Sequence, residues 1–282
     1  MNLPLENADR PTVEGFGREW STFTQSGTEF SAEERQAIFD GYFSIFPWQT
    51  LPPNATGADI GCGSGRWATL VAPRVGLLHA VDASPDALAI ARTNLAGFDN
   101  VRLHQASVSN LPFADGELDF AYSLGVLHHV PDTAGAIRDV AAKLKPGASF
   151  LIYLYYAFDN RSALFRALWM ASNMVRIVLS RVPYALQIVA TTILAATVYW
   201  PLARGAALLE RIGAMPRSWP LAFYRSRSFY VMRTDAFDRF CTRLEQRFTR
   251  VQIADMLRSA GFTGIVFSDN EPYWVAVAVK TR

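Results

Sequence analysis

The chain has 282 residues, which suffices for one large α/β domain or for one ordinary domain with a sizeable insertion, and is too short for several domains. Half of the residues are hydrophobic and 18% are charged, which excludes a disordered chain, and the net charge of +2 gives no electrostatic case for binding nucleic acid. Two cysteines, Cys62 and Cys241, are too few for a disulfide framework or a four-ligand zinc site. We therefore predict no metal centre, and a protein of a reducing compartment.

The first ten residues carry acidic side chains and lack the apolar core of a secretory signal. This pattern predicts a cytoplasmic protein that acts where it is made, with contact to the inner face of the membrane as an open alternative. The sequence indicates no oligomeric state.

Charge is distributed unevenly along the chain. Residues 157–227 contain nine arginines against Asp159 and Glu210, a local balance of +7 in a chain whose net charge is only +2. The same stretch holds an uncharged run over residues 182–203. A basic and apolar piece has therefore been inserted into an otherwise acidic chain.

The predicted elements begin with a helix over residues 31–46, with Ser31 as its N-cap and Glu34 in capping-box position. Short apolar runs then alternate with helical patterns, which predicts a parallel sheet covered on both faces. We predict strands over residues 58–61, 77–81, 101–105, 118–123 and 149–155, and helices over residues 66–72, 85–95 and 133–144. After a long helical, arginine-bearing stretch come a helix over residues 249–260 and strands over residues 264–268 and 273–280.

A glycine-rich segment, residues 59–66 (DIGCGSGR), lies between the first predicted strand and the first predicted helix. Its glycines allow a sharp turn and close approach of a ligand. The spacing is GxGxG and not the GxGxxG of dinucleotide sites, because Arg66 stands where the third glycine would be. Asp82, at the end of the next strand, can accept both ribose hydroxyls of a nucleoside, while Asp59 suits a ligand with a cationic amine or sulfonium.

At this point the sequence resembles the class I S-adenosylmethionine-dependent methyltransferases. Residues 105–113, 119–132 and 144–147 resemble the family's later landmarks in order. The resemblance implies an α/β fold with a Rossmann-like, doubly wound sheet of seven strands, mostly parallel with one antiparallel strand, and a helical insertion after strand five. It divides the chain into an N-terminal helical cap (1–50), a cofactor-binding core (51–156), a helical acceptor-binding lid (157–234) and the C-terminal part of the core (235–282).

The resemblance implies S-adenosylmethionine as cofactor and S-adenosylhomocysteine as product. One departure from the family is Ser107, which stands where an acid usually accepts a hydrogen bond from the adenine amine. Residues 15–20 (GFGREW) resemble a segment that folds over the cofactor in one subgroup, and a surface turn is the alternative. The expected cofactor-binding residues are Asp59, Gly61, Cys62, Gly63, Gly65, Asp82, Ala83, Ser107, Val108, Ser123 and Leu124.

Methyl transfer from a sulfonium is an in-line displacement, so orientation and exclusion of water supply most of the rate. A general base is needed only for a poorly nucleophilic acceptor. His128 and His129 follow the fourth strand at the edge where ligands of such sheets bind, and are the catalytic candidates, with loop capping as the alternative. Tyr155, Tyr156 and Asn160 are candidate acceptor contacts.

The insertion allows three interpretations: a helical lid over a lipophilic pocket, a face that rests on a membrane through residues 157–227, and a membrane span. A single span would separate the last helix and strands from their sheet, so the lid is favoured. The predicted function is methylation of a small, lipophilic metabolite on O, N or C. The alternatives are a membrane lipid or lipid-linked acceptor at the membrane surface, and a module that binds S-adenosylmethionine without transferring its methyl group.

Overall fold

The computed structural model describes residues 6–25, 30–214, 216 and 219–281. Two compact units divide these residues. The core unit contains residues 6–25, 36–160 and 244–281. The helical unit contains the described residues of 30–35 and 161–243. Arg217 and the first five residues, which entered the charge and signal predictions, lie outside the described residues.

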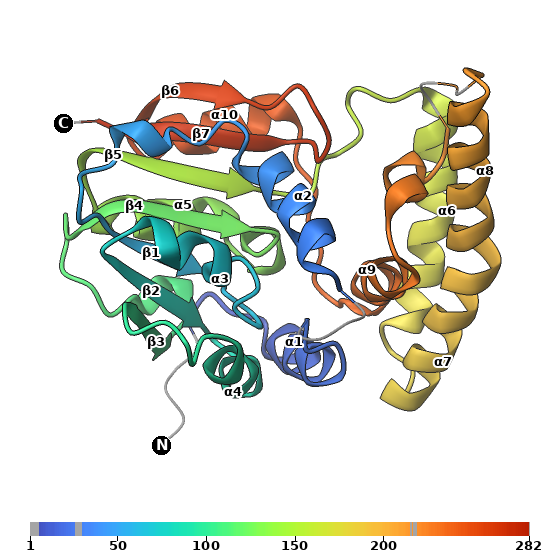
Figure 1. Ribbon diagram of the computed structural model, residues 1–282, viewed down its shortest axis with the longest axis horizontal. Helices are drawn as coiled ribbons and strands as arrows, with labels where there is room; N and C mark the ends of the chain where they lie inside the picture. The colour runs from blue at the N-terminus through green and yellow to red at the C-terminus, as the bar shows by residue number, and fades with distance from the viewer. Residues whose placement is uncertain (1–5, 26–29, 215, 217–218, 282) are drawn as a thin grey trace. The chain divides into compact units, whose positions relative to one another are not determined.

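The core unit is built on a seven-stranded sheet with the order β3-β2-β1-β4-β5-β7-β6 (Figure 1). The first five strands are parallel, and β7 runs antiparallel to both β5 and β6. The strands are β1 (Thr56–Ile60), β2 (Leu77–Asp82), β3 (Val101–Gln105), β4 (Leu118–Leu124), β5 (Leu144–Tyr153), β6 (Phe262–Phe267) and β7 (Val275–Lys280). The predicted fold class is confirmed, including its single antiparallel strand.

Helices cover both faces of this sheet, because its strands are apolar on both sides. One face is packed by α5 (Thr133–Lys143) and α10 (Arg250–Ser259). The other is packed by α2 (Ala32–Phe43), the short α3 (Ala68–Val71) and α4 (Pro85–Asn94). Because β1, β2, β4 and β5 are parallel, their carboxyl ends share one edge of the sheet. A ligand can reach the loops that follow these strands there.

Some predicted boundaries were wrong. The strand expected over residues 149–155 is β5, which begins earlier, at Leu144, because a shift in register against β4 and a positive φ of 86° at Gly147 absorb a bend within it. The helix expected over residues 66–72 has only one α-helical turn, since Pro73 continues it as a 3-10 turn over Ala72–Arg74. The helix expected to reach residue 46 ends at Phe43.

Residues 15–20 are helical, which neither sequence interpretation had predicted. They lie in α1 (Arg10–Thr22), which begins at Asp9, whose carboxylate accepts from the backbone N–H of Thr12. Gly15 and Gly17 lie in the middle of this helix. Glycine disfavours helix formation, so the sequence pattern hid an element that is held in place by its packing against α4.

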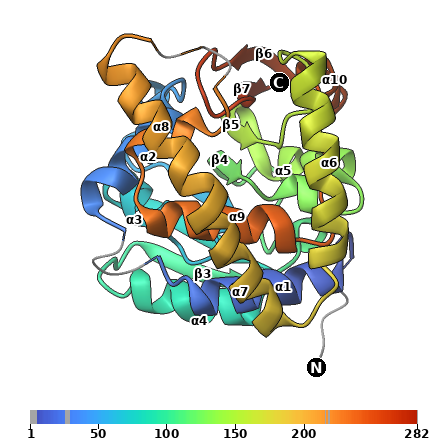
Figure 2. The same cartoon turned by 90° about the vertical axis from the view of Figure 1, so that its right-hand side faces the viewer.

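The helical unit contains α6 (Ala163–Leu179), α7 (Tyr184–Leu194), a π-helical turn (Ala195–Tyr199), α8 (Trp200–Arg211), a 3-10 turn (Ala222–Ser226) and α9 (Phe229–Cys241). Figure 2 shows α7 and α8 as one long helix in front of α9. Pro201 cannot donate a backbone hydrogen bond, which accounts for the π-helical turn just before it. The unit has its own small core of Ala195, Tyr199, Ala203, Met232, Ala236 and Phe240.

The limits of this unit differ from those predicted for the insertion. It extends to Arg243, so residues 235–243 belong with the helices and not with the C-terminal part of the sheet. Residues 157–160 remain in the core unit. Residues 30–35 join the helical unit, in which the Glu34 carboxylate accepts from the backbone N–H of Ser228 at 2.8 Å.

Candidate cofactor and acceptor site

The glycine-rich loop after β1 uses most of its backbone N–H groups to hold its own shape. Gly61 and Cys62 both donate to the carbonyl of Val81, and Gly65 donates to the carbonyl of Cys62. Gly61 has a φ of +80°, and a Cβ on it would lie 2.3 Å from Val126. Because these N–H groups are already bonded, the loop suits a ligand that lies against it without a phosphate.

Asp82 ends β2 and is fixed by two backbone donors. Its Oδ2 accepts from Gly63 at 2.9 Å and its Oδ1 accepts from Ser84 at 2.8 Å. Burial raises the pKa of this carboxyl, and the backbone hydrogen bonds oppose the rise. Each carboxylate oxygen keeps acceptor capacity beyond these bonds, so the side chain can receive the two hydroxyls of a ribose.

Asp59 lies inside the sheet in β1 and is only 2% exposed. The hydroxyl of Tyr122, in β4, donates to its Oδ2 at 2.9 Å. Burial raises the pKa of Asp59 to about 8, with the charge of Asp82 adding to the rise. The carboxylate therefore carries its charge at a cost in free energy, which a cationic ligand would offset.

Two buried hydroxyls fit an adenosine ligand. Among the described residues, the Oγ atoms of Ser107 and Ser64 are buried without a hydrogen-bond partner. Ser107 is 5% exposed at the carboxyl end of β3, where its oxygen can accept from an adenine amine. Trp20 of α1 lies against the loop, because a Cβ on Gly63 would be 2.9 Å from the indole nitrogen. The residues present therefore fit S-adenosylmethionine.

The other predicted cofactor contacts lie in β4, in the glycine-rich loop or at the ends of strands. The hydroxyl of Ser123 donates to the carbonyl of Ile60 and is fully buried between two strands, and the Cys62 thiol is buried in the core. Ala83 follows Asp82, Val108 begins the turn after Ser107, and Leu124 ends β4, all at the same edge of the sheet.

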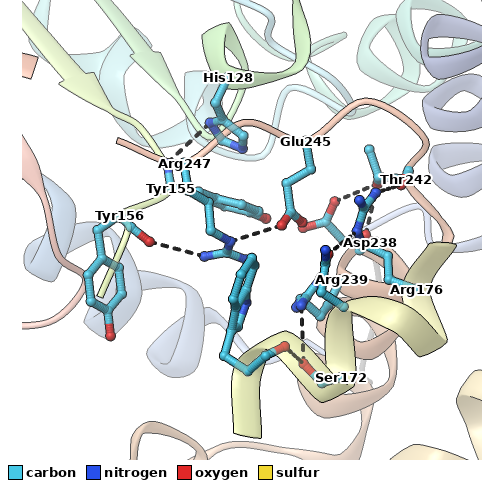
Figure 3. A network of polar contacts seen from close by, with 12 residues as sticks. His128, Tyr155, Tyr156, Ser172, Arg176, Asp238, Arg239, Thr242, Glu245 and Arg247 are labelled. Carbon is cyan, nitrogen blue, oxygen red and sulfur yellow. Dashed lines mark hydrogen bonds and ion pairs between the residues drawn. The ribbon is translucent and has the colours of Figure 1, made fainter. Parts of the chain in front are cut away.

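His128 is completely buried. Its Nδ1 accepts from the backbone N–H of Tyr155 at 3.4 Å, and its ring stacks on that of Tyr155 at 3.8 Å (Figure 3). Burial lowers the pKa of His128 well below 6.5, with His129 and Arg247 acting in the same direction. The neutral ring with Nδ1 as acceptor carries its proton on Nε2, so it can donate there but cannot take up a proton.

His129 has the opposite tautomer. Its Nδ1 lies 2.6 Å from the carbonyl oxygen of Leu244, and since a carbonyl only accepts, Nδ1 carries the proton. The lone pair of a neutral His129 is therefore on Nε2. Phe16 of α1 packs edge-on against this ring at 5.0 Å. The two adjacent histidines thus have different chemistry, which their sequence positions alone do not distinguish.

A segment absent from our predictions holds these groups in place. We call residues 244–248 the strap. Besides the Leu244 carbonyl, it provides the backbone N–H of Gln246, which donates to the carbonyl of His128 at 3.0 Å, and that of Phe248, which donates to the carbonyl of Tyr155 at 2.9 Å. The only signal in the sequence is a Glu and an Arg that flank Gln246 just before a capping-box threonine.

Arg247 of the strap ties the aromatic residues to a buried carboxylate. Its Nε lies 2.9 Å from Glu245, whose side chain is 1% exposed, and its guanidinium carbon lies 5.0 Å above the Tyr155 ring (Figure 3). Arg247 also donates to the carbonyl of Tyr156 at 3.4 Å. These contacts fix Tyr155 over His128.

The predicted acceptor contacts do not all come together. The Tyr156 ring points away from His128 in Figure 3 and packs against Phe158 and Trp274. Asn160 is exposed at the limit of the core unit. Tyr155 is the one of the three that stacks on a candidate catalytic side chain. No group of three or more metal-ligating side chains occurs among the described residues.

Residues 58–152 match the family model described as a methyltransferase domain. The chain therefore carries a class I S-adenosylmethionine-dependent methyltransferase domain. S-Adenosylmethionine is the cofactor of this class, which agrees with the loop, the carboxylate after β2 and the two hydroxyls. The predicted family and cofactor are confirmed.

Similar proteins match a segment about as long as this domain and cover only about a third of the chain. The chain is 35% identical over 104 residues to the uncharacterized methyltransferase YcgJ of Bacillus subtilis, covering 36% of this chain and 41% of that protein. It is 29% identical over 100 residues to a demethylmenaquinone methyltransferase of Bacillus licheniformis, covering 34% and 43%. The chain thus matches less than half the length of these relatives.

Solved structures of similar fold match nearly the whole chain. The CurJ carbon methyltransferase has a TM-score of 0.55 and 15% sequence identity, with 96% of this chain and 61% of that chain covered. At this level of identity the likeness shows the shared fold.

Proposed function

We propose that this chain transfers the methyl group of S-adenosylmethionine to a small, lipophilic acceptor. The observation that carries the proposal is the arrangement at one edge of the core unit. The Asp82 carboxylate, fixed by two backbone N–H groups, follows β2, and a cluster of imidazole and tyrosine rings follows β4 and β5. This arrangement supports a nucleoside site and a second site for the acceptor at the same edge.

The chain's own residues bind and orient the cofactor. Asp82 receives the ribose hydroxyls and Ser107 receives the adenine amine, while Asp59 ionises as the cationic end of the ligand binds beside it. When bound, S-adenosylmethionine supplies an electrophilic methyl group. The protein then accelerates the displacement by holding the acceptor in line with that group.

The aromatic side chains support a lipophilic acceptor. The ring of Tyr153, at the end of β5, lies 5.2 Å from that of Tyr42 and 5.9 Å from that of Tyr155. Such rings give apolar contact area while their hydroxyls provide orientation. The matched relative from Bacillus licheniformis acts, by its name, on demethylmenaquinone, an acceptor of this chemical kind.

His129 is the better candidate for taking a proton from the acceptor, because its Nδ1 donates to Leu244 and leaves the lone pair on Nε2. His128 is suited to donating a hydrogen bond that orients the acceptor. That the insertion serves as a lid over the acceptor stays a prediction.

The test is methyl transfer from labelled S-adenosylmethionine to a panel of quinones, phenols and sterols. Wild type should label at least one lipophilic acceptor, and Asp82→Ala should bind the cofactor about 30-fold to 1,000-fold more weakly, as expected from losing two charge-assisted hydrogen bonds. Asp99→Ala, at an exposed carboxyl, is the matched control. Tight cofactor binding without transfer to any acceptor, including protein and RNA, would favour a non-transferring module instead.

A further inference from the structure

The helical unit carries a surface that its own packing does not explain. Large apolar side chains on α6, α7 and α8 are 39–66% exposed. We call them the outer stripe: Leu168, Met170, Met174, Val175, Val178, Leu186, Val189, Ile193, Val198, Trp200, Leu208 and Ile212. We propose that the outer stripe binds the surface of an anionic lipid bilayer, with α6 and the α7–α8 helix lying in the plane of its interface.

The α7–α8 helix already buries a different face. Small and aromatic residues repeat about every four positions at Thr191, Ala195, Tyr199 and Ala203. All four are buried, and the last three belong to the core that α9 contributes to. Leu186, Val189 and Ile193 lie on the opposite, exposed side. A helix that is apolar on both sides needs two apolar environments, and α9 provides only one of them.

Two arginines of the unit bind its own backbone. Arg176 donates to the carbonyls of Thr242 and Arg243, and Arg204 donates to those of Arg225 and Arg227, so both hold the unit together. They are therefore unsuited to contact lipid phosphates.

Arg166, Arg181 and Arg211 are exposed. They lie near the start of α6, in the turn between α6 and α7, and at the end of α8. Cations thus flank the outer stripe at the ends of both helices. This is the pattern that complements an anionic headgroup layer over an apolar interior.

Length and composition would also allow the α7–α8 helix, Tyr184–Arg211, to cross a membrane. It is the one helix of that kind within the described part of the chain. Crossing would expose the buried Thr191 and the Arg204 side chain to lipid and would remove Ala195 and Ala203 from α9. Lying in the interface preserves these contacts and covers only the outer stripe, so it is the favoured orientation.

Flotation with preformed vesicles tests the apolar part of the proposal. Wild type should bind vesicles of phosphatidylglycerol and phosphatidylcholine, and Val189→Asp with Ile193→Asp should lower the partition coefficient at least about tenfold. The matched control is Val251→Asp with Val266→Asp, which replaces equally exposed valines of the core unit and should leave binding unchanged. Circular dichroism and cofactor affinity confirm that each variant is folded.

The charges are tested separately. Replacing Arg166, Arg181 and Arg211 by Gln should weaken binding to anionic vesicles about fivefold for each residue. Wild-type binding should fall with added salt and should be weak on phosphatidylcholine alone. The same change at Arg92, Arg138 and Arg258, exposed arginines of the core unit, should have no comparable effect.

Fluorescence quenching by brominated lipids tests the orientation, because Trp200 lies on the outer stripe and is 40% exposed. The part of the quenching that is due to Trp200 is the difference between wild type and Trp200→Phe. It should be stronger with bromines near the headgroup than with bromines near the bilayer centre. The reverse depth order would overturn the in-plane orientation and favour a span.

Self-association is the competing explanation. A concentration-dependent dimer that Ile193→Asp dissociates, with no wild-type binding to vesicles, would overturn the proposal. The vesicle experiments are independent of methyl transfer, because Asp82→Ala should bind vesicles as wild type does. Failure of this inference is therefore distinguishable from failure of the proposed function.

Discussion

At the scale of single residues, the two carboxylates of the cofactor site differ in how they carry charge. Asp82 accepts from two backbone N–H groups, whereas Asp59 accepts from the Tyr122 hydroxyl alone among its described side-chain contacts. Burial raises the pKa of both, for Asp59 to about 8. At neutral pH most of Asp59 is therefore protonated before a cation arrives.

Cofactor affinity should consequently depend on pH. If the ligand requires ionised Asp59, the apparent affinity should increase from pH 6 to pH 8, by up to about tenfold per pH unit, and binding at neutral pH should release a proton. Calorimetry in buffers of different ionisation enthalpy measures both quantities. Asp59→Asn should bind more weakly and with little pH dependence, and an equal pH dependence in this variant would assign the effect to another group.

The tautomers of the two histidines predict different kinetic roles. His129→Gln should lower kcat by about 100-fold and abolish the decline of kcat at acid pH, because the acceptor's proton then has no base. His128→Gln keeps a donor, so it should retain that decline while raising KM. If only His128→Gln loses the acid decline, the roles are reversed.

At the scale of elements, α1 connects helix packing to the cofactor loop. A Cβ on Gly17 would lie 2.6 Å from the Oγ of Ser84, which caps α4, whereas one on Gly15 would meet nothing within 4 Å. The two glycines of one helix therefore have unequal consequences, although glycine disfavours the helix at both positions.

Gly15→Ala should stabilise the protein by about 0.5–1 kcal/mol. In Gly17→Ala the free energy of unfolding should instead be about 1 kcal/mol lower than in wild type, since the Ser84 hydroxyl must leave its capping position. Because Ser84 also donates to Asp82, cofactor affinity should fall severalfold in Gly17→Ala only. Thermal unfolding and titration of both variants provide the comparison, and equal behaviour would place α1 away from α4 in solution.

The strap shows why some site residues escape sequence reasoning. Leu244, Gln246 and Phe248 act through backbone groups, which every residue possesses. Their partners, His129, His128 and Tyr155, are about a hundred positions earlier, so no local pattern reports the pairing.

At the scale of the molecule, the buried titratable groups should shape stability against pH. The pKa values of His79, His104 and His128 are lowered by burial, so these side chains resist protonation in the folded state and stability is lost as pH falls below about 6.5. Asp59 has a raised pKa, so its contribution to stability is lost as pH rises toward 8. The two effects together predict that the free energy of unfolding is largest near pH 6.5.

From pH 6.5 to 8 the free energy of unfolding should fall by about 2 kcal/mol through Asp59, and less in Asp59→Asn. Denaturant unfolding at several pH values between 6.5 and 8 measures this fall in the free energy of unfolding. The transition to follow is the one that S-adenosylmethionine shifts. The cofactor should reduce the dependence, because its cation favours the ionised carboxylate. A wild-type free energy of unfolding that does not change between pH 6.5 and 8 would contradict the raised pKa of Asp59.

Sequence patterns predicted the fold class and most of the strands and helices in chain order, and they indicated candidate cofactor residues in local motifs. The local motif predicts candidate residues because strand ends and tight turns require particular residue types at fixed spacing. These candidates are Gly61, Gly63, Gly65, Asp59 and Asp82. The tautomers of His128 and His129, the role of the strap, the helix α1 and the internal binding of Arg176 and Arg204 could be found only from the folded arrangement. These depend on contacts between residues distant in the chain, and the energies of such contacts override local propensity.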